Sequence, residues 1–315
     1  LIAAVMALVA VGERGHTEEN VGTVRQPLVG GQIVSEATQE EFGLLSFGNN
    51  AGSCSASLLR NDWVITAAHC VESQDTMGRK TPDPARPGQF MLRPLSSYFL
   101  TANWDGGQTR KCVRVETFQP YDVALLQTAT PFKVHGSTSG YSRLVFQDGQ
   151  FPYFGNPVGA GLLIFGRGIN QFASGSYASA RPSRSDGLYR FGYARANRSA
   201  DNYYWYPSEG GQMIAGGDSG GPSFAWVLGG YALVGVHSRA QASYAPGHEF
   251  KPGDDPWQWV TSTPEAADAP IAPVWPQILA IIGPANAPET PPPPQFIGDF
   301  GKSDPNYHPI FLYGI

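Results

Sequence analysis

Short apolar runs broken by glycine and proline limit most strongly the folds that are open to this chain. The 315 residues include 38 Gly and 27 Pro, and both residue types disfavour long helices. Turn signals such as DGG at 105–107 and SEGG at 208–211 punctuate the sequence. The strand-like runs between such signals are WVIT at 63–66, VALLQ at 123–127, GLLIFG at 161–166 and YALVGVHS at 231–238. This pattern predicts an all-β sandwich or barrels.

Charge and hydropathy argue against two classes of partner. Charged residues make up 15% of the chain and the formal net charge is −5, with no cluster of Lys and Arg. We therefore expect no nucleic-acid partner. No run after the N-terminus approaches the roughly 18 uninterrupted apolar residues of a membrane span, so we also expect no stable membrane span.

The two ends of the chain differ from its middle. The first twelve residues, LIAAVMALVAVG, are mostly apolar and too few to cross a bilayer. They suit the apolar part of a secretory signal whose basic start is missing, or else an ordinary buried strand or helix. We expect residues 1–27 to be a leader of a secreted, extracellular or periplasmic protein. GPANAPETPPPPQ at 283–295 predicts a polyproline linker, which opens a Pro-rich and aromatic tail over 283–315.

The chain has three cysteines: Cys54, Cys70 and Cys112. An odd number allows at most one internal disulfide and leaves one thiol. A Cys54–Cys70 bridge would close a short loop and add roughly 3 kcal/mol of stability in the chain-entropy model. It would also hold His69 beside a rigid link. No cysteine has the spacing of a metal site, so we expect neither a metal nor another cofactor.

Two polar residues stand beside strand-like runs. His69 lies in TAAHC at 66–70, and Asp122 immediately precedes a buried apolar run. A lone histidine is more often structural than catalytic. Asp122 is by itself either a solvated turn residue or a partly buried acid that orients a partner.

Ser219 lies in AGGDSGGP at 215–222, where four glycines surround it. This is either a glycine-rich turn or a nucleophile held where backbone N–H groups converge. A serine hydroxyl needs a base to take its proton, and that base needs a buried carboxylate to fix its tautomer. The amides of Gly217 and Ser219 would then stabilise an oxyanion.

TAAHC, DVALL and GGDSGGP occur in this order, with Cys54 ahead of the histidine. In these motifs the chain resembles the chymotrypsin/trypsin-like serine peptidase family over a domain at 28–282. The resemblance implies an all-β fold of two packed antiparallel six-stranded β-barrels with the active site between them. The N-terminal barrel is expected at about 28–136, the C-terminal barrel at about 155–270 and a short C-terminal helix at about 276–282.

The resemblance also implies the roles of individual residues. His69 is the general base and acid, Asp122 orients it, and Ser219 is the nucleophile. Gly217 and Ser219 form the oxyanion hole. The implied activity is endopeptidase hydrolysis of polypeptide substrates through an acyl-enzyme.

Specificity is less constrained by the resemblance. Met213 stands at the base of the primary pocket and carries no charge, so we do not expect a preference for Arg or Lys. His237 occupies the place where bacterial glutamyl endopeptidases bind glutamate through a histidine. A preference for glutamate and one for medium apolar side chains both stay open. The other implied substrate-binding residues are Gly216, Ser238, Arg239 and Ala240.

LVGG at 28–31 is similar to the new N-terminus that activates members of this family. After cleavage the ammonium group of Leu28 would pair with the buried carboxylate of Asp218. Pro27 precedes this site, and bonds after proline resist most endopeptidases. One route is a cut after Arg25 followed by removal of a dipeptide.

The implied partners are therefore polypeptide substrates, an activating peptidase and a proteinaceous inhibitor. Two alternatives to an active enzyme stay open. The first is a catalytically silent homologue, and the second is an uncleaved zymogen; either would act as a binding protein.

Overall fold

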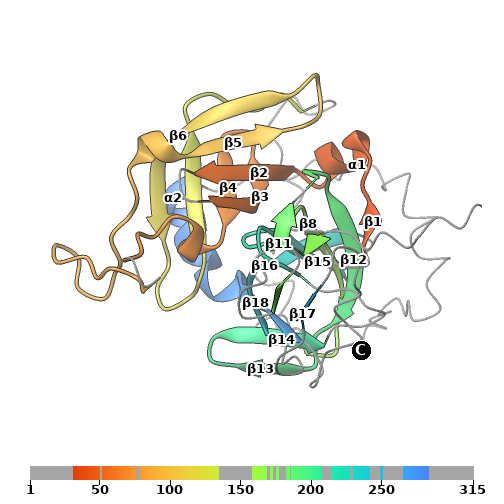
Figure 1. The fold of residues 1–315 in the computed structure, drawn as a ribbon. Helices are drawn as coiled ribbons and strands as arrows, with labels where there is room; N and C mark the ends of the chain where they lie inside the picture. The colour runs from red at the N-terminus through yellow and green to blue at the C-terminus, as the bar shows by residue number, and fades with distance from the viewer. Residues whose placement is uncertain are drawn as a thin grey trace, which may run out of the picture.

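The computed structural model describes residues 31–49, 52–75, 79–134, 158–168, 171–172, 175–176, 182–184, 186–207, 214–227, 230–241, 249–250 and 265–283. The expected leader and nearly all of the Pro-rich tail lie outside these residues. Two β units make up the described part, and they stand side by side in Figure 1. Among the helices described, none combines the length and the apolar character that crossing a membrane requires.

The first unit is a closed antiparallel barrel with the strand order β2-β3-β4-β7-β6-β5. Its interior is apolar, and its strands bend at register shifts between Leu58 and Arg60 and between Cys112 and Arg114, as closure of a barrel requires. The strands are β2 (Leu44–Asn49), β3 (Gly52–Arg60), β4 (Trp63–Thr66), β5 (Phe99–Ala102), β6 (Gln108–Thr117) and β7 (Ala124–Thr128).

The second unit is an eight-stranded sheet with the order β1-β12-β8-β15-β16-β18-β14-β13. Its strands are β1 (Gln32–Ile33), β8 (Gly161–Gly166), β12 (Arg190–Arg195), β13 (Arg198–Ala200), β14 (Tyr203–Pro207), β15 (Pro222–Val227), β16 (Gly230–Gln241) and β18 (Glu265–Pro270). Two short pairs complete the strands: β9 (Gln171–Phe172) with β11 (Pro182–Arg184), and β10 (Gly175–Ser176) with β17 (Glu249–Phe250).

The expected all-β, chymotrypsin-like fold is confirmed, with one difference in the second unit. We expected a second six-stranded barrel, whereas the described residues form a sheet of eight strands. The first described strand, β1, pairs with β12 at one edge, and β13 pairs with β14 at the other. Both additions are short strands at an edge, which local sequence patterns mark only weakly.

The helices are short. Helix α1 (Glu36–Glu41) begins at Ser35, whose hydroxyl accepts a hydrogen bond from the amide of Thr38. Helix α2 (Trp275–Ile282) starts within one residue of its expected position and ends at Gly283, whose φ is 77°. The remaining helical turns are η1 (Ala68–Cys70), η2 (Leu95–Ser97) and η4 (Ala272–Val274).

Aromatic packing and a clamped helix end join the two units. Phe42, next to β2, packs against Phe165 of β8 and Phe224 of β15, with ring centroids 4.7 and 5.0 Å away. Arg60 of β3 donates hydrogen bonds to the carbonyl oxygens of Ile282 and Gly283, at 2.5 and 2.6 Å. The first unit therefore holds the C-terminal end of α2.

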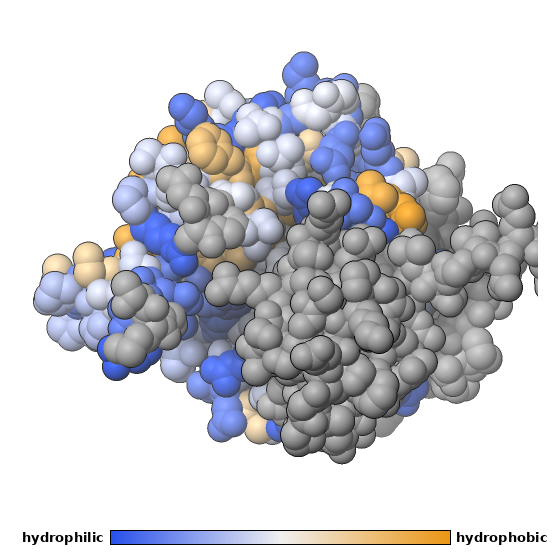
Figure 2. Space-filling model, in the orientation of Figure 1, coloured by the Kyte–Doolittle hydropathy of each residue, from blue (hydrophilic) through white to orange (hydrophobic). Residues whose placement is uncertain are grey.

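The described surface is mixed in character. On the face drawn in Figure 2, apolar residues form separate patches among hydrophilic ones. The aromatic stretch DNYYWYP at 201–207 lies mostly in the interior, because Tyr204 and Tyr206 of β14 are each 1% exposed. This stretch therefore packs within the second unit.

Candidate active site

His69 and Asp122 meet because their strands are neighbours in the barrel. His69 lies in η1, just after β4, and Asp122 lies just before β7, which pairs with β4. The backbone amide of His69 donates to Oδ1 of Asp122 at 2.8 Å. The ring nitrogen Nδ1 of His69 lies 2.6 Å from Oδ2 of the same carboxylate. A carboxylate only accepts, so Nδ1 carries the proton and Nε2 is left free to accept one.

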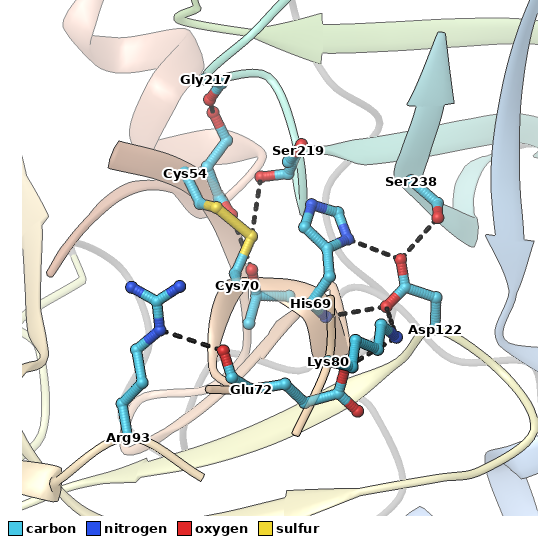
Figure 3. Close-up of a disulfide and its surroundings, with 12 residues drawn as sticks. Cys54, His69, Cys70, Glu72, Lys80, Arg93, Asp122, Gly217, Ser219 and Ser238 are labelled. Atoms are coloured by element: carbon cyan, nitrogen blue, oxygen red, sulfur yellow. Dashed lines mark hydrogen bonds and ion pairs between the residues drawn. A yellow bond between two sulfur atoms is a disulfide. The ribbon is translucent and has the colours of Figure 1, made fainter. Parts of the chain in front are cut away.

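Ser238 brings the second unit to the same carboxylate. Its hydroxyl, on β16, donates to Oδ2 of Asp122 at 2.5 Å, and Figure 3 shows His69, Asp122 and Ser238 in this arrangement. Burial alone would raise the pKa of Asp122. Hydrogen bonds from His69 and Ser238, together with the charges of His69 and Lys80, outweigh burial and lower the pKa from 3.8 to about 2. The acid is therefore ionised at neutral pH.

A disulfide links η1, the turn that holds His69, to a strand of the barrel. Cys54 of β3 and Cys70 of η1 are bonded, with an S–S length of 2.05 Å. Atoms of Cys54, His69 and Cys70 that resemble a metal-ligand set lie within 4.8 Å of one another. Because the two sulfurs are bonded to each other, neither is a free thiolate for a metal.

Ser219 lies in a tight turn that is anchored on the first barrel. Its carbonyl oxygen accepts from the amide of Ser55 at 2.8 Å, and the hydroxyl of Ser55 donates to the carbonyl oxygen of Gly217 at 3.0 Å. Gly217 and Gly220 have φ values of +97° and +79°, which side chains rarely adopt. A Cβ at Gly220 would also lie 2.5 Å from the carbonyl oxygen of Ser55.

This anchoring brings the turn to the histidine. The carbonyl oxygen of Ser219 lies 3.7 Å from Sγ of Cys70, the residue after His69. Figure 3 shows Ser219 on the side of the His69 ring that faces away from Asp122. The structure therefore brings together His69, Asp122 and Ser219, which are far apart in the sequence.

Asp218 supports the same turn from inside the second unit. The residue is fully buried. One carboxylate oxygen accepts from the amide of Gly168 at 2.5 Å and the other from the amide of Ala215 at 2.7 Å. Leu28, its expected partner after cleavage, lies outside the described residues.

The expected pocket residues are placed only in part. Met213 lies outside the described residues, and Gly216 and Ala240 are exposed. Arg239 is also exposed, and its guanidinium carbon lies 4.2 Å from the ring centroid of Tyr203. The charge of Arg239 therefore rests on an aromatic ring of β14.

His237 lies in the interior of the second unit, where its side chain is 0% exposed. Nδ1 lies 2.8 Å from Oδ1 of Asp268, and Nε2 lies 3.0 Å from the carbonyl oxygen of Phe165. Both partners are acceptors, so both ring nitrogens carry protons and the ring is a cation. Both nitrogens already have protein partners in this arrangement, so the expected contact with a substrate glutamate receives no support from the structure.

The carboxylate of Asp268 collects further donors. The hydroxyl groups of Tyr204 and Tyr206 donate to it at 3.0 and 2.9 Å, and Ser223 donates to Oδ2 as well. Burial opposes a charged ring, but the charge and hydrogen bond of Asp268 raise the pKa of His237 above 6.5. The pair is therefore a buried ion pair with satisfied partners.

Sequence reasoning missed Asp268, Lys80 and Glu72. Lys80 lies 4.0 Å from Oδ1 of Asp122, and Glu72 lies 2.7 Å from Lys80. None of these residues stands in a motif. A charged residue within an alanine-rich strand, as Asp268 is in EAADAP, is the one signal that could have indicated a buried polar group.

A closed β-barrel beside a second sheet, with a histidine held by an aspartate near a serine in a glycine turn, fits the class of chymotrypsin-like serine peptidases. The family model described as Trypsin matches residues 29–253, which is more than half of the chain, and the chain therefore belongs to the trypsin family. The expected family is thereby confirmed, and it makes the chain a trypsin-like serine peptidase.

Proposed function

We propose that this protein is a serine endopeptidase in which His69, Asp122 and Ser219 form the catalytic triad. The observation that carries the proposal is the bond from His69 Nδ1 to Asp122, because it fixes the tautomer in which Nε2 accepts a proton. The proposal is also supported by the glycine turn, because the carbonyl oxygen of Ser219 lies 3.7 Å from Sγ of Cys70, the residue after His69.

In the proposed reaction, Ser219 attacks the carbonyl carbon of the scissile bond and Nε2 of His69 takes the hydroxyl proton. The amides of Gly217 and Ser219 donate to the oxyanion that develops. His69 then gives its proton to the leaving amine, the C–N bond breaks, and an acyl-enzyme remains. Water attacks the acyl-enzyme by the same steps, which releases the acid and restores Ser219.

For specificity, we propose a preference for medium apolar side chains at P1 over Arg, Lys and Glu. Met213 offers no carboxylate to a basic side chain. The ring of His237 is buried, and its two nitrogens bind Asp268 and Phe165, so a glutamate would have to displace one of them. Polypeptides remain the proposed substrates.

Maturation and location follow the same proposal. Cleavage that exposes Leu28 would allow its ammonium group to reach Asp218, because a buried carboxylate gains most from a paired charge. The intact Cys54–Cys70 bond favours an oxidising compartment and therefore secretion. An activating peptidase and a proteinaceous inhibitor are the partners that such an enzyme would meet.

The experiment is cleavage-site profiling on a diverse peptide library. The full chain, a chain that begins at Leu28, and the latter with Ser219→Ala are compared. We expect cuts after medium apolar residues in the chain that begins at Leu28 and none in the alanine variant. Cuts that persist in the variant would refute the role of Ser219, and cuts after Glu would return His237 to the pocket.

The absence of cuts in all three proteins would favour the alternative of a silent homologue. Cuts in the shortened chain alone would identify the full chain as a zymogen. The presence of His69, Asp122 and Ser219 together argues for catalysis, because a protein that only binds needs no base beside a serine.

A further inference from the structure

Lys80 reaches the aspartate of the proposed triad from a segment outside the barrel. This segment runs between η1 and η2 and is tied together by backbone bridges from Glu72 to Leu92 and from Gln74 to Lys80. The ammonium group of Lys80 lies 4.0 Å from Oδ1 of Asp122, and Figure 3 shows it beside that carboxylate. Its side chain is only 32% exposed.

Glu72 holds Lys80 in this position. Its Oε2 lies 2.7 Å from the ammonium group, and its Oε1 accepts from the side-chain amide of Gln119 at 2.7 Å. Glu72 is fully buried, and its carbonyl oxygen accepts from Arg93 at 3.0 Å. One carboxylate oxygen is thus held by a hydrogen bond, and the other is held by the ion pair with Lys80 alone.

An aromatic ring also contacts the ammonium group of Lys80. Its ammonium nitrogen lies 5.0 Å from the ring centroid of Phe90, within the range of a cation–π contact. An exposed ion pair contributes little because both partners are solvated and mobile. Here Glu72 is buried and the ammonium group of Lys80 contacts the ring of Phe90. The positive charge of Lys80 is therefore held at a defined position beside Asp122.

The groups that face Asp122 can be named from each element. His69 comes from η1, Ser238 from β16 and Lys80 from the bridged segment. Burial raises the pKa of Asp122, the bonds of His69 and Ser238 lower it, and the charge of Lys80 lowers it further. Glu72 is the opposing charge behind Lys80.

We propose that Lys80 and Glu72 are a positioning pair that sets how strongly Asp122 stabilises the protonated ring of His69. The inference rests on the proposed role of His69 as the base. Lys80 is closer to Asp122 and partly cancels its charge, so protonated His69 is held less strongly. The enzyme then keeps a neutral, active base to lower pH.

The two charges of the pair predict opposite effects. Lys80→Met removes the cation and leaves Glu72 negative, so the midpoint of the His69 ring titration moves to higher pH. Glu72→Gln leaves the cation uncompensated, so the midpoint moves to lower pH. Each shift is expected to be about half a pH unit, from a charge at this distance with an effective dielectric near 20 and partial screening.

The experiment follows the His69 ring by NMR as a function of pH in Ser219→Ala protein. His69→Gln identifies the resonance. The variants are Lys80→Met, Glu72→Gln and the double variant, and Lys111→Met, at an exposed position of β6, is the matched control. From highest to lowest midpoint we expect Lys80→Met, the double variant, the unsubstituted and control proteins, and Glu72→Gln.

Lys80→Met leaves a buried carboxylate unpaired and is the variant most exposed to misfolding. The double variant leaves no unpaired charge. The comparison of its His69 midpoint with that of Glu72→Gln is therefore sufficient to test the inference. Equal midpoints in these two proteins would overturn the inference, because a merely structural pair does not move a titration.

Hydrolysis by the enzyme with Ser219 in place gives a separate readout. The acid limb of kcat/KM against pH should move in the same direction as the ring titration. An inactive enzyme whose ring midpoints follow the expected order would refute the proposed function and leave the positioning pair standing.

Discussion

Within the described residues, two histidine–aspartate pairs have nearly equal hydrogen-bond lengths but differ in their exposure to solvent. His69 and Asp122 lie 2.6 Å apart where the barrel meets the second unit, and the histidine side chain is 24% exposed. His237 and Asp268 lie 2.8 Å apart inside the second unit, and both side chains are 0% exposed. The hydrogen bond between ring and carboxylate is therefore not what distinguishes a site of chemistry.

The partner of the second ring nitrogen makes the difference. Nε2 of His237 meets the carbonyl oxygen of Phe165, which only accepts, so the ring keeps both protons. Nε2 of His69 faces Ser219, whose hydroxyl can give a proton away (Figure 3). The His237 ring thus keeps both protons, whereas in the proposed triad the His69 ring takes a proton from Ser219 and gives it to the leaving amine.

The two pairs are nevertheless connected through the nucleophile turn. The amide of Gly220 donates to the carbonyl oxygen of His237 at 2.7 Å, and the amide of His237 donates to the carbonyl oxygen of Gly221 at 2.8 Å. The buried pair therefore fixes the strand on which the turn rests. We expect it to affect stability first and catalysis only through that support.

The largest expected effect is on catalysis by the two histidine-to-glutamine variants. His69→Gln removes the base and should lower kcat/KM by at least about 10⁴-fold with little change in the unfolding midpoint. His237→Gln should keep kcat/KM within about tenfold for the folded fraction. Steady-state kinetics with active-site titration measures both, and equal losses would abolish the distinction between the pairs.

The next effect is on stability. Asp268→Asn leaves the cation of His237 without its charge partner in the interior, which costs about 3–5 kcal/mol when a buried pair is broken. Urea unfolding should report this loss in the free energy of unfolding. Asp122→Asn is the matched control in the other pair and should lose less, because Asp122 is buried but its partners His69 and Lys80 are 24% and 32% exposed. A smaller loss for Asp268→Asn than for Asp122→Asn would contradict the account.

A smaller effect separates the two serines that donate to the aspartates. Ser238→Ala removes a donor to Asp122 and should lower kcat/KM by about tenfold, in line with a bond to a charged group. Ser223→Ala makes the same change at Asp268 and should lower the free energy of unfolding while kcat/KM stays nearly constant. Steady-state kinetics and urea unfolding of both variants test whether Ser238→Ala affects mainly kcat/KM and Ser223→Ala mainly the free energy of unfolding.

The smallest effect is on the pH dependence of stability. One pair should lose its stabilising contribution as the pH rises, and the other should lose it as the pH falls. The raised pKa of His237 makes its contribution fully present below pH 6.5 and lost as pH rises through the folded pKa. The lowered pKa of Asp122 makes its contribution present above pH 3.8 and lost as pH falls through about 2.

The difference in unfolding free energy between the unsubstituted protein and His237→Gln should therefore shrink as the pH rises. The difference from Asp122→Asn should shrink on acidification instead. Urea unfolding across the pH range follows both, and a His237 difference that grows with pH would speak against a buried cation.

Part of the fold could be predicted from the sequence, and part of it could not. The strands at 63–66 and 161–166 coincide with β4 and β8, because apolar runs between turns are local signals. Helix α1 was missed, since EATQEE carries no apolar period and its start depends on a cap at Ser35. The second sheet was expected as a barrel, and its edge strands depend on distant partners.

The candidate site also contains residues that the sequence predicts and residues that it does not. His69, Asp122 and Ser219 stand in motifs that a resemblance can carry from one chain to another. Asp268 and Lys80 act through partners far away in the sequence, so only the fold shows what they contact. His237 shows the limit most clearly, because the resemblance placed it in a pocket while its ring lies in the interior.

The most direct test of the central claim is covalent labelling with a fluorophosphonate probe, followed by mass spectrometry of the labelled peptide. The chain that begins at Leu28 and its His69→Gln and His237→Gln variants are compared. We predict that Ser219 is labelled in the unsubstituted and His237→Gln proteins and not in His69→Gln. Labelling of another residue, or equal labelling of Ser219 without His69, would contradict a triad in which the His69–Asp122 pair alone activates the serine.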